Sequence, residues 1–192
     1  MTLDDFLRRL PKAELHCHLL GSVRRDTFAD LVRQRAAPIS AAEIAAFYTR
    51  GEKPVGVLRV LRALDAWLLR TADDFHRLCY EYLSDAAAHH VRYAEFFWNP
   101  TGTAREGRLP YAQALQGIRR AIADAQHDHG IVGRLVAAID REASPRDASE
   151  MVRWVIEARC DEVLGIGIDY RENERPPELF VDAYRAARRA GL

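Results

Sequence analysis

Two histidines that lie two positions apart are the residues of this sequence best suited to carry chemistry. His16 and His18 flank Cys17 in KAELHCHLLG (12–21), whose first residues have the pattern of a β-strand. Side chains two apart on a strand point the same way. We therefore expect Glu14, His16 and His18 to share one face and Cys17 to lie on the opposite, packing face. Neutral imidazole nitrogens bind zinc, copper, iron or nickel. Because HxH is a weak motif by itself, hydrogen-bonded interior histidines remain the alternative.

A second pair with the same spacing, His127 and His129, stands just before Gly130 at the end of a predicted helix. Residues two apart on a helix diverge by about 200°. These side chains are therefore typical of a helix C-terminus at the surface, where positive charge is favourable. The sequence has no HExxH, GxSxG or P-loop pattern, so the first pair is its one metal-like motif.

Four apolar runs of strand length alternate with segments of helical spacing along the chain. The predicted strands cover residues 12–19, 91–98, 134–139 and 163–168. The predicted helices that follow them cover 26–36 and 110–129, begin at Ser144-Pro145, and run from about 177 to 190. Serial strand–helix units favour an α/β fold with a parallel sheet and right-handed crossovers. We expect one domain over residues 1–192, because no repeat, linker or low-complexity tract interrupts it.

An additional helical region, about 38–88, separates the first strand–helix unit from the second. It is too long for a simple loop, so we expect it to cover one end of the sheet. The sequence predicts a turn at TRGEKPVG (49–56). An apolar stripe then recurs at helical spacing: Leu58, Leu61, Leu64 and Trp67.

Composition limits the class of partner. The 192 residues are 48% hydrophobic, with 28 basic and 28 acidic side chains. This balance gives no net electrostatic field that would attract nucleic acid or an anionic membrane. No uncharged apolar run is long enough to span a bilayer. We expect a small-molecule substrate, a cytoplasmic location and reduced thiols at Cys17, Cys79 and Cys160. The sequence does not indicate an oligomeric state.

Several segments, in order, resemble the adenosine/adenine deaminase family of the metal-dependent amidohydrolase superfamily. They are PKAELHCHLLGS, RYAEFFWNP, GRLVAAIDRE, and VLGIGID with PPELFVDAYRAARRAGL. The resemblance implies a (β/α)8 TIM-type barrel of which this chain forms the N-terminal half. It also implies that His16 and His18 are two ligands of one zinc ion. The implied reaction is hydrolytic removal of an exocyclic amine from a purine-like ring.

In that family the catalytic acid/base groups and the other metal ligands come from the fifth strand onward. We therefore expect no catalytic residue within this chain and place those groups beyond Leu192, in a longer protein. The hypothesis for the isolated chain is weak zinc binding without deaminase activity. The alternative is a truncated or degenerate family member that acts as a binding or partner-dependent fragment.

Leu20 departs from the family pattern, which has an acidic residue at this position. An isobutyl side chain cannot accept a hydrogen bond from a sugar hydroxyl. Leu20 therefore argues against ordinary adenosine as the substrate and in favour of a related aminated heterocycle.

Further substrate-binding candidates stand at the ends of the predicted strands. They are Trp98, Asn99, Asp140, Arg141, Asp169 and Tyr170. A tryptophan could stack on a ring, and Asp169 or Arg141 could contact its polar edges. Packing of the aromatic side chain and a surface salt bridge are the alternatives. In the family, the stripe that begins at Leu58 forms an apolar lid, and core packing explains the same stripe equally well.

Overall fold

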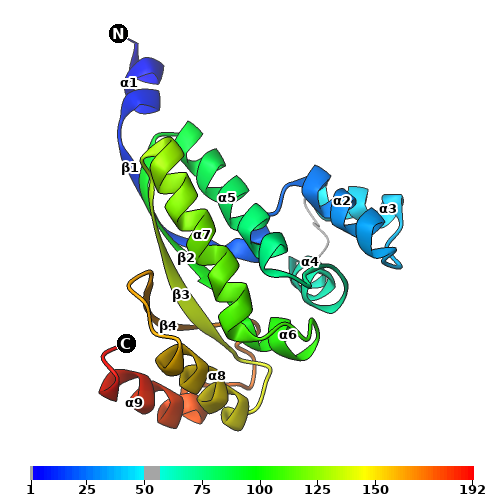
Figure 1. Ribbon diagram of the computed structural model, residues 1–192, viewed down its shortest axis with the longest axis vertical. Coiled ribbons are helices and arrows are strands. Elements are labelled where there is room, and N and C mark those ends of the chain that lie inside the picture. The colour runs from blue at the N-terminus through cyan, green and yellow to red at the C-terminus, as the bar shows by residue number, and fades with distance from the viewer. Residues whose placement is uncertain (1, 50–56) are drawn as a thin grey trace.

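A four-stranded parallel sheet organises the computed structural model, which describes residues 2–49 and 57–192 (Figure 1). The strands lie side by side in chain order. They are β1 (Lys12–His18), β2 (Val91–Trp98), β3 (Val132–Asp140) and β4 (Val163–Asp169). The predicted α/β class and parallel sheet are confirmed, and β3 begins two residues earlier than predicted.

Helices connect the strands and cover the sheet. Before β2 lie α1 (Leu3–Arg9), η1 (Leu19–Ser22), α2 (Arg25–Arg35), α3 (Ala41–Tyr48), α4 (Val57–Ala63), η2 (Leu64–Leu68) and α5 (Ala72–Ala88). After β2 lie α6 (Pro100–Arg105), α7 (Tyr111–His129), α8 (Pro145–Glu157), η3 (Pro177–Phe180) and α9 (Val181–Arg189). Figure 1 shows α5 and α7 side by side along one face of the sheet. Within the described residues no helix is long and apolar enough to cross a membrane.

Local sequence signals set the helix ends near the site. Ser144 caps α8 and exchanges side-chain and backbone hydrogen bonds with Asp147, while Pro145 occupies the first turn. These contacts satisfy amide groups that a helix start leaves without partners. Gly130 ends α7 at φ 65°, in the left-handed region that glycine enters at little cost. The predicted start of α8 and the predicted end of α7 are both confirmed.

The extra region between β1 and β2 is helical, as predicted. Its α4 runs directly into a π-helical segment, η2, a geometry often found near functional sites. The predicted apolar stripe is split, because Leu64 is fully buried whereas Trp67 is half exposed. Most of the predicted turn at TRGEKPVG lies outside the described residues.

Strand register brings the carboxyl ends of the four strands to one edge of the sheet. His18 pairs with Phe97, Trp98 pairs with Ala137, and Asp140 pairs with Asp169. In parallel α/β sheets, ligands bind beyond this edge. The strand-end residues singled out in the sequence are thus gathered at one end of the molecule.

Candidate active site and metal centre

His16 and His18 lie on the same side of the sheet, and both contact the ring of Phe97. The two imidazole centroids are 5.5 Å apart. The Phe97 centroid lies 4.4 Å from that of His16 and 5.7 Å from that of His18. An aromatic ring from the neighbouring strand therefore supports both histidines.

Glu14 does not share this face, so the prediction that it lies with the histidines is wrong. The pairing of β1 with β2 shifts register between Glu14 and Cys17, as at a β-bulge, which breaks the alternation of side chains. The Tyr82 hydroxyl of α5 donates a 2.8 Å hydrogen bond to the Glu14 carboxylate. Cys17 packs against the core as predicted, and burial raises the pKa of its thiol.

Asp169 brings a buried carboxylate to the histidine pair from the end of β4. One of its oxygens accepts a 3.2 Å hydrogen bond from the Asn99 amide, and the other lies 3.8 Å from His18 Nδ1. Burial, and next the nearby Asp140 carboxylate, raise the pKa of Asp169 to about 8. Burial, and next His16, lower the pKa of His18, which favours the neutral imidazole that a metal requires.

Arg62 of α4 reaches across the same edge and joins several segments. Both terminal nitrogens of its guanidinium lie 3.3 Å from one Asp140 oxygen. One of them also lies 2.9 Å from Glu142 and the other 3.4 Å from Glu106. Sequence reasoning missed Arg62, which resembles any charged residue on the polar side of an amphipathic helix.

A cavity of about 260 Å³ opens beside the histidine pair. The side chains that line it are His18, Leu58, Leu61, Asp169, Tyr170 and Arg171. Leu58 and Leu61, which the family resemblance places in an apolar lid, therefore form part of the wall of a cavity. Leu20 is not among the lining residues and lies in the core with 5% of its surface exposed.

Two strand-end candidates, Trp98 and Arg141, contact other parts of the protein. The Trp98 ring, 1% exposed, stacks on Tyr111 at 5.6 Å, and its indole N–H donates to the Thr103 hydroxyl at 3.1 Å. Arg141 donates a 3.3 Å hydrogen bond to the backbone carbonyl of Arg175. The placement of Trp98 differs from the expected substrate stack, because this side chain turns into the helical layer.

Asp65, on the π-helical segment η2, is a buried acid that the sequence analysis did not single out. One carboxylate oxygen accepts a 2.8 Å hydrogen bond from Thr103, and the other has no partner in the described part of the chain. Burial raises its pKa to about 7. A single acid within the apolar stretch LRALDAWLL is the sequence signal that could have found it.

The donor set fits zinc only in part. Two imidazoles on one face suit this metal, which takes four ligands in most protein sites. Residues 2–49 and 57–192 contain no group of three or more His, Cys, Asp or Glu side chains arranged to hold a metal ion. His16 and His18 therefore fit as two ligands of a shell that needs further donors.

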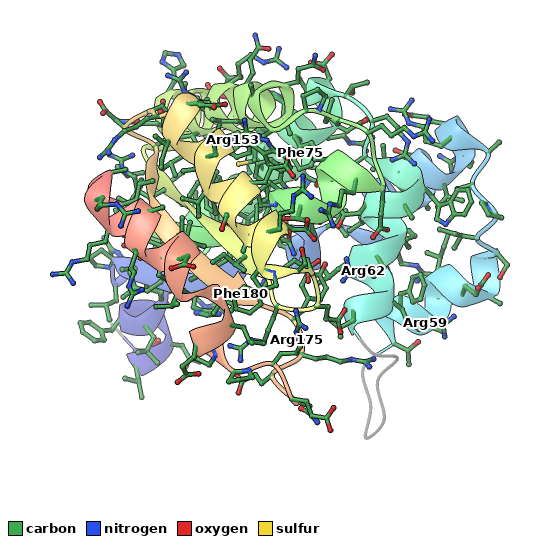
Figure 2. All side chains as sticks on the ribbon, turned by 90° about the horizontal axis from the view of Figure 1, so that it is seen from below. Arg59, Arg62, Phe75, Arg153, Arg175 and Phe180 are labelled. Atoms are coloured by element: carbon green, nitrogen blue, oxygen red, sulfur yellow. The ribbon has the colours of Figure 1, made fainter. Side chains whose placement is uncertain are left out.

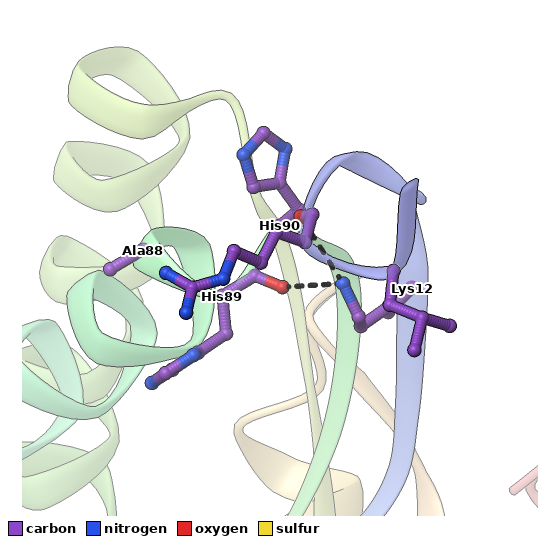
Figure 3. Close-up of a pocket in the computed structure, with 6 residues that line it drawn as sticks. Lys12, Ala88, His89 and His90 are labelled. Carbon is purple, nitrogen blue, oxygen red and sulfur yellow. Dashed lines mark hydrogen bonds between the residues drawn. The ribbon is translucent and has the colours of Figure 1, made fainter. Parts of the chain in front are cut away.

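A larger cavity, about 580 Å³, lies at the opposite, amino-terminal end of β1 (Figure 3). There the Lys12 ammonium donates hydrogen bonds to the backbone carbonyls of Leu10 and His89, at 2.9 and 3.0 Å. The Lys12 ammonium is thus already hydrogen-bonded to backbone carbonyls at the ends of α1 and α5. The chemistry-bearing residues gather around the smaller cavity.

Comparison with known proteins is consistent with this geometry. The family model described as adenosine deaminase matches residues 11–192. The chain belongs to the adenosine deaminase family. Among curated members, adenine deaminase of Vibrio parahaemolyticus is 31% identical over 193 residues, covering 99% of this chain and 56% of the relative. An uncharacterized deaminase of Schizosaccharomyces pombe is 32% identical over 192 residues, covering 98% of this chain and 56% of the relative.

Two solved structures share the fold of this chain over about half of their own length. An amidohydrolase from Burkholderia ambifaria, solved with bound Zn, is 60% identical with a TM-score of 0.97, covering all of this chain and 53% of that protein. Adenine deaminase from Arthrobacter aurescens is 28% identical with a TM-score of 0.83, covering 95% of this chain and 55% of that protein. The chain therefore spans about half the length of the relatives that it matches, corresponding to the N-terminal half of a deaminase TIM barrel.

Proposed function

We propose that this chain supplies the metal-binding strand and one wall of the substrate pocket in a hydrolytic deaminase. The substrate is a purine-like aminated heterocycle or nucleoside, and the metal is one zinc ion. The observation that carries the proposal is the position of His18, which lines a cavity together with a buried carboxylate and apolar side chains. The zinc-bound relative and the adenine deaminases among the relatives support this assignment.

Bound zinc would supply Lewis-acid activation of water for attack on the carbon that carries the amine. His16 and His18 would hold the ion through neutral imidazole nitrogens, and Phe97 keeps both rings in place. Leu58 and Leu61 would exclude water above the heterocycle. Asp169, whose buried carboxyl lies 3.8 Å from His18 Nδ1 and has a raised pKa, provides a further polar group beside the histidine pair.

Leu20 argues for a substrate other than ordinary adenosine. The side chain is packed in the core and offers no acceptor to a ribose hydroxyl. Recognition of the sugar would therefore rely on other groups. A free base such as adenine needs no such contact.

Ammonia release tests the proposed function. The longest polypeptide that the gene encodes, containing residues 1–192 and loaded with zinc, is incubated with adenine, adenosine and related aminopurines. We expect turnover of at least one free base and loss of this turnover in His16→Ala and His18→Ala.

The same assay on the isolated chain of residues 1–192 is the companion measurement. We expect no turnover, because the described residues hold no group of three metal ligands and the family resemblance places the catalytic acid/base groups in later strands. Absence of ammonia release from every aminopurine in the longest polypeptide would overturn the proposal. Activity that persists without both histidines would do the same.

A further inference from the structure

Tyr170 adopts a backbone conformation that a bulky side chain rarely takes. Its φ is 68°, in the left-handed region, immediately after the last residue of β4. Neighbouring side chains on an extended strand point to opposite sides. The left-handed turn instead leaves both Asp169 and Tyr170 lining the same cavity. Strain of this kind persists where the surrounding structure holds it, and it often marks a functional site.

The Tyr170 ring is held by Arg62. The guanidinium carbon lies 4.2 Å from the ring centroid, which is cation–π distance. The same guanidinium also donates hydrogen bonds to Asp140 and Glu142. These contacts tie the Tyr170 ring to β3 and to helix α4 at once, so its orientation is set by the fold.

Helix α4 provides both apolar side chains that line the cavity and the arginine that holds the Tyr170 ring. Leu58 and Leu61, one helical turn apart, line the cavity with Tyr170. Arg62 follows Leu61 directly on the same helix (Figure 2). The Arg62 charge is engaged by carboxylates, and Arg171, which also lines the cavity, lies 3.5 Å from Glu142. The contribution of α4 and Tyr170 to the cavity is therefore an aromatic and aliphatic wall. Such a wall complements a flat, uncharged ring and restricts the bulk attached to it.

We propose that Tyr170 is a specificity-determining residue that limits the substituent on the heterocycle, and that Arg62 is its positioning residue. The favoured ligand class is a compact, uncharged aminated base that carries no sugar or other bulky group. This inference rests on the proposed function. To the proposed function, this inference adds the residues that form one wall of the pocket and the class of substrate that this wall selects.

A comparison of three compounds separates steric exclusion by the Tyr170 wall from the effect of Leu20. The ratios of kcat/KM for adenine against adenosine and for adenine against 9-ethyladenine are measured in the zinc-loaded longest polypeptide. The ethyl compound adds bulk without sugar hydroxyls, so its ratio is independent of the missing acceptor at Leu20. Equilibrium binding of the same three compounds is measured in parallel by titration calorimetry.

Tyr170→Gly removes the ring and suits the left-handed backbone, so the variant is expected to fold. We expect its selectivity for adenine over 9-ethyladenine to fall at least tenfold, the scale at which pockets discriminate small apolar groups. Tyr170→Phe keeps the ring and should keep the ratio. Arg62→Ala should relax the ratio in the same direction. Arg62→Lys, which keeps the charge without the planar stack, should restore it in part.

Arg59→Ala is the matched control, because Arg59 is an exposed arginine on the same helix (Figure 2). We expect no change in either ratio. Unchanged selectivity in Tyr170→Gly, with turnover retained, overturns this inference and leaves the proposed function intact. A wild-type protein that neither deaminates nor binds any of the three compounds overturns the proposed function, and this inference with it.

Discussion

Gly167 and Phe97 approach so closely that no side chain fits between them. A Cβ at Gly167 would lie 2.7 Å from the Cε1 atom of Phe97. The same ring contacts His16, with centroids 4.4 Å apart. The absence of a side chain on β4 thus gives the ring on β2 room to support a candidate metal ligand on β1.

Substitution of Gly167 by alanine is predicted to crowd this contact. The added methyl group must displace the Phe97 ring, which also contacts His16, and overpacking of this kind costs about 1–3 kcal/mol. Chemical denaturation measures the loss in the free energy of unfolding, and metal analysis measures the accompanying fall in zinc content. Gly165→Ala is the control, since a Cβ there meets its nearest atom at an ordinary 3.6 Å. Equal effects of the two substitutions would contradict the assigned role of Gly167.

Zinc content should depend on the strand pair and not on the helix pair. The double variant His16→Ala/His18→Ala is expected to lose the zinc that the wild-type protein retains after dialysis, because both nitrogen donors are removed. His127→Ala/His129→Ala removes two histidines of identical spacing at the end of α7, and it should leave the metal content unchanged. Equal zinc in wild type and in the strand variant would remove His16 and His18 from the metal site.

The parts of the fold that were predictable from sequence follow from local signals. Apolar runs marked the four strands, and capping residues such as Ser144 and Gly130 marked helix ends, because each signal acts within a few residues. The common direction of His16 and His18 followed from strand alternation. The family resemblance then connected this pair to zinc.

The remaining site features depend on irregular backbone or on tertiary contacts. Strand alternation misplaced Glu14 because a shift in strand pairing follows it. Trp98 turned into the helical layer, where Tyr111 and Thr103 hold it. The ring of Tyr170 depends on a left-handed turn and on an arginine from α4. These features involve partners that are distant in sequence, so composition and spacing do not indicate them.

Trp98 is predicted to serve stability and not substrate selection. The ring is fully buried between Phe75 and Tyr111. Trp98→Ala should therefore lower the free energy of unfolding by about 3–5 kcal/mol, as large core truncations do. Trp98→Phe should retain more of that free energy and leave the adenine to 9-ethyladenine selectivity unchanged. A change in selectivity with normal stability would instead place the ring in the substrate pocket.

Asp65 makes folding stability depend on pH in an unusual direction for an acid. Its pKa in the folded protein is raised from the ordinary 3.8 to about 7, chiefly by burial. Between these pH values the folded state keeps a proton that the unfolded state has released. Stability from this group is therefore present at low pH and is lost as the pH rises from about 4 to about 7.

Asp65→Asn should remove this loss, because an uncharged amide replaces a carboxylate whose second oxygen lacks a partner among the described residues. The difference in unfolding free energy between the variant and wild type is expected to shift in favour of the variant by a few kcal/mol as the pH rises from about 4 to about 7.5. The slope is about 1.4 kcal/mol per pH unit between the two pKa values. Urea denaturation at both pH values measures the difference. Asp161→Asn, at an exposed position, is the control and should shift little between them. An Asp65→Asn difference that is the same at both pH values would show that the carboxylate is already ionised in the folded protein.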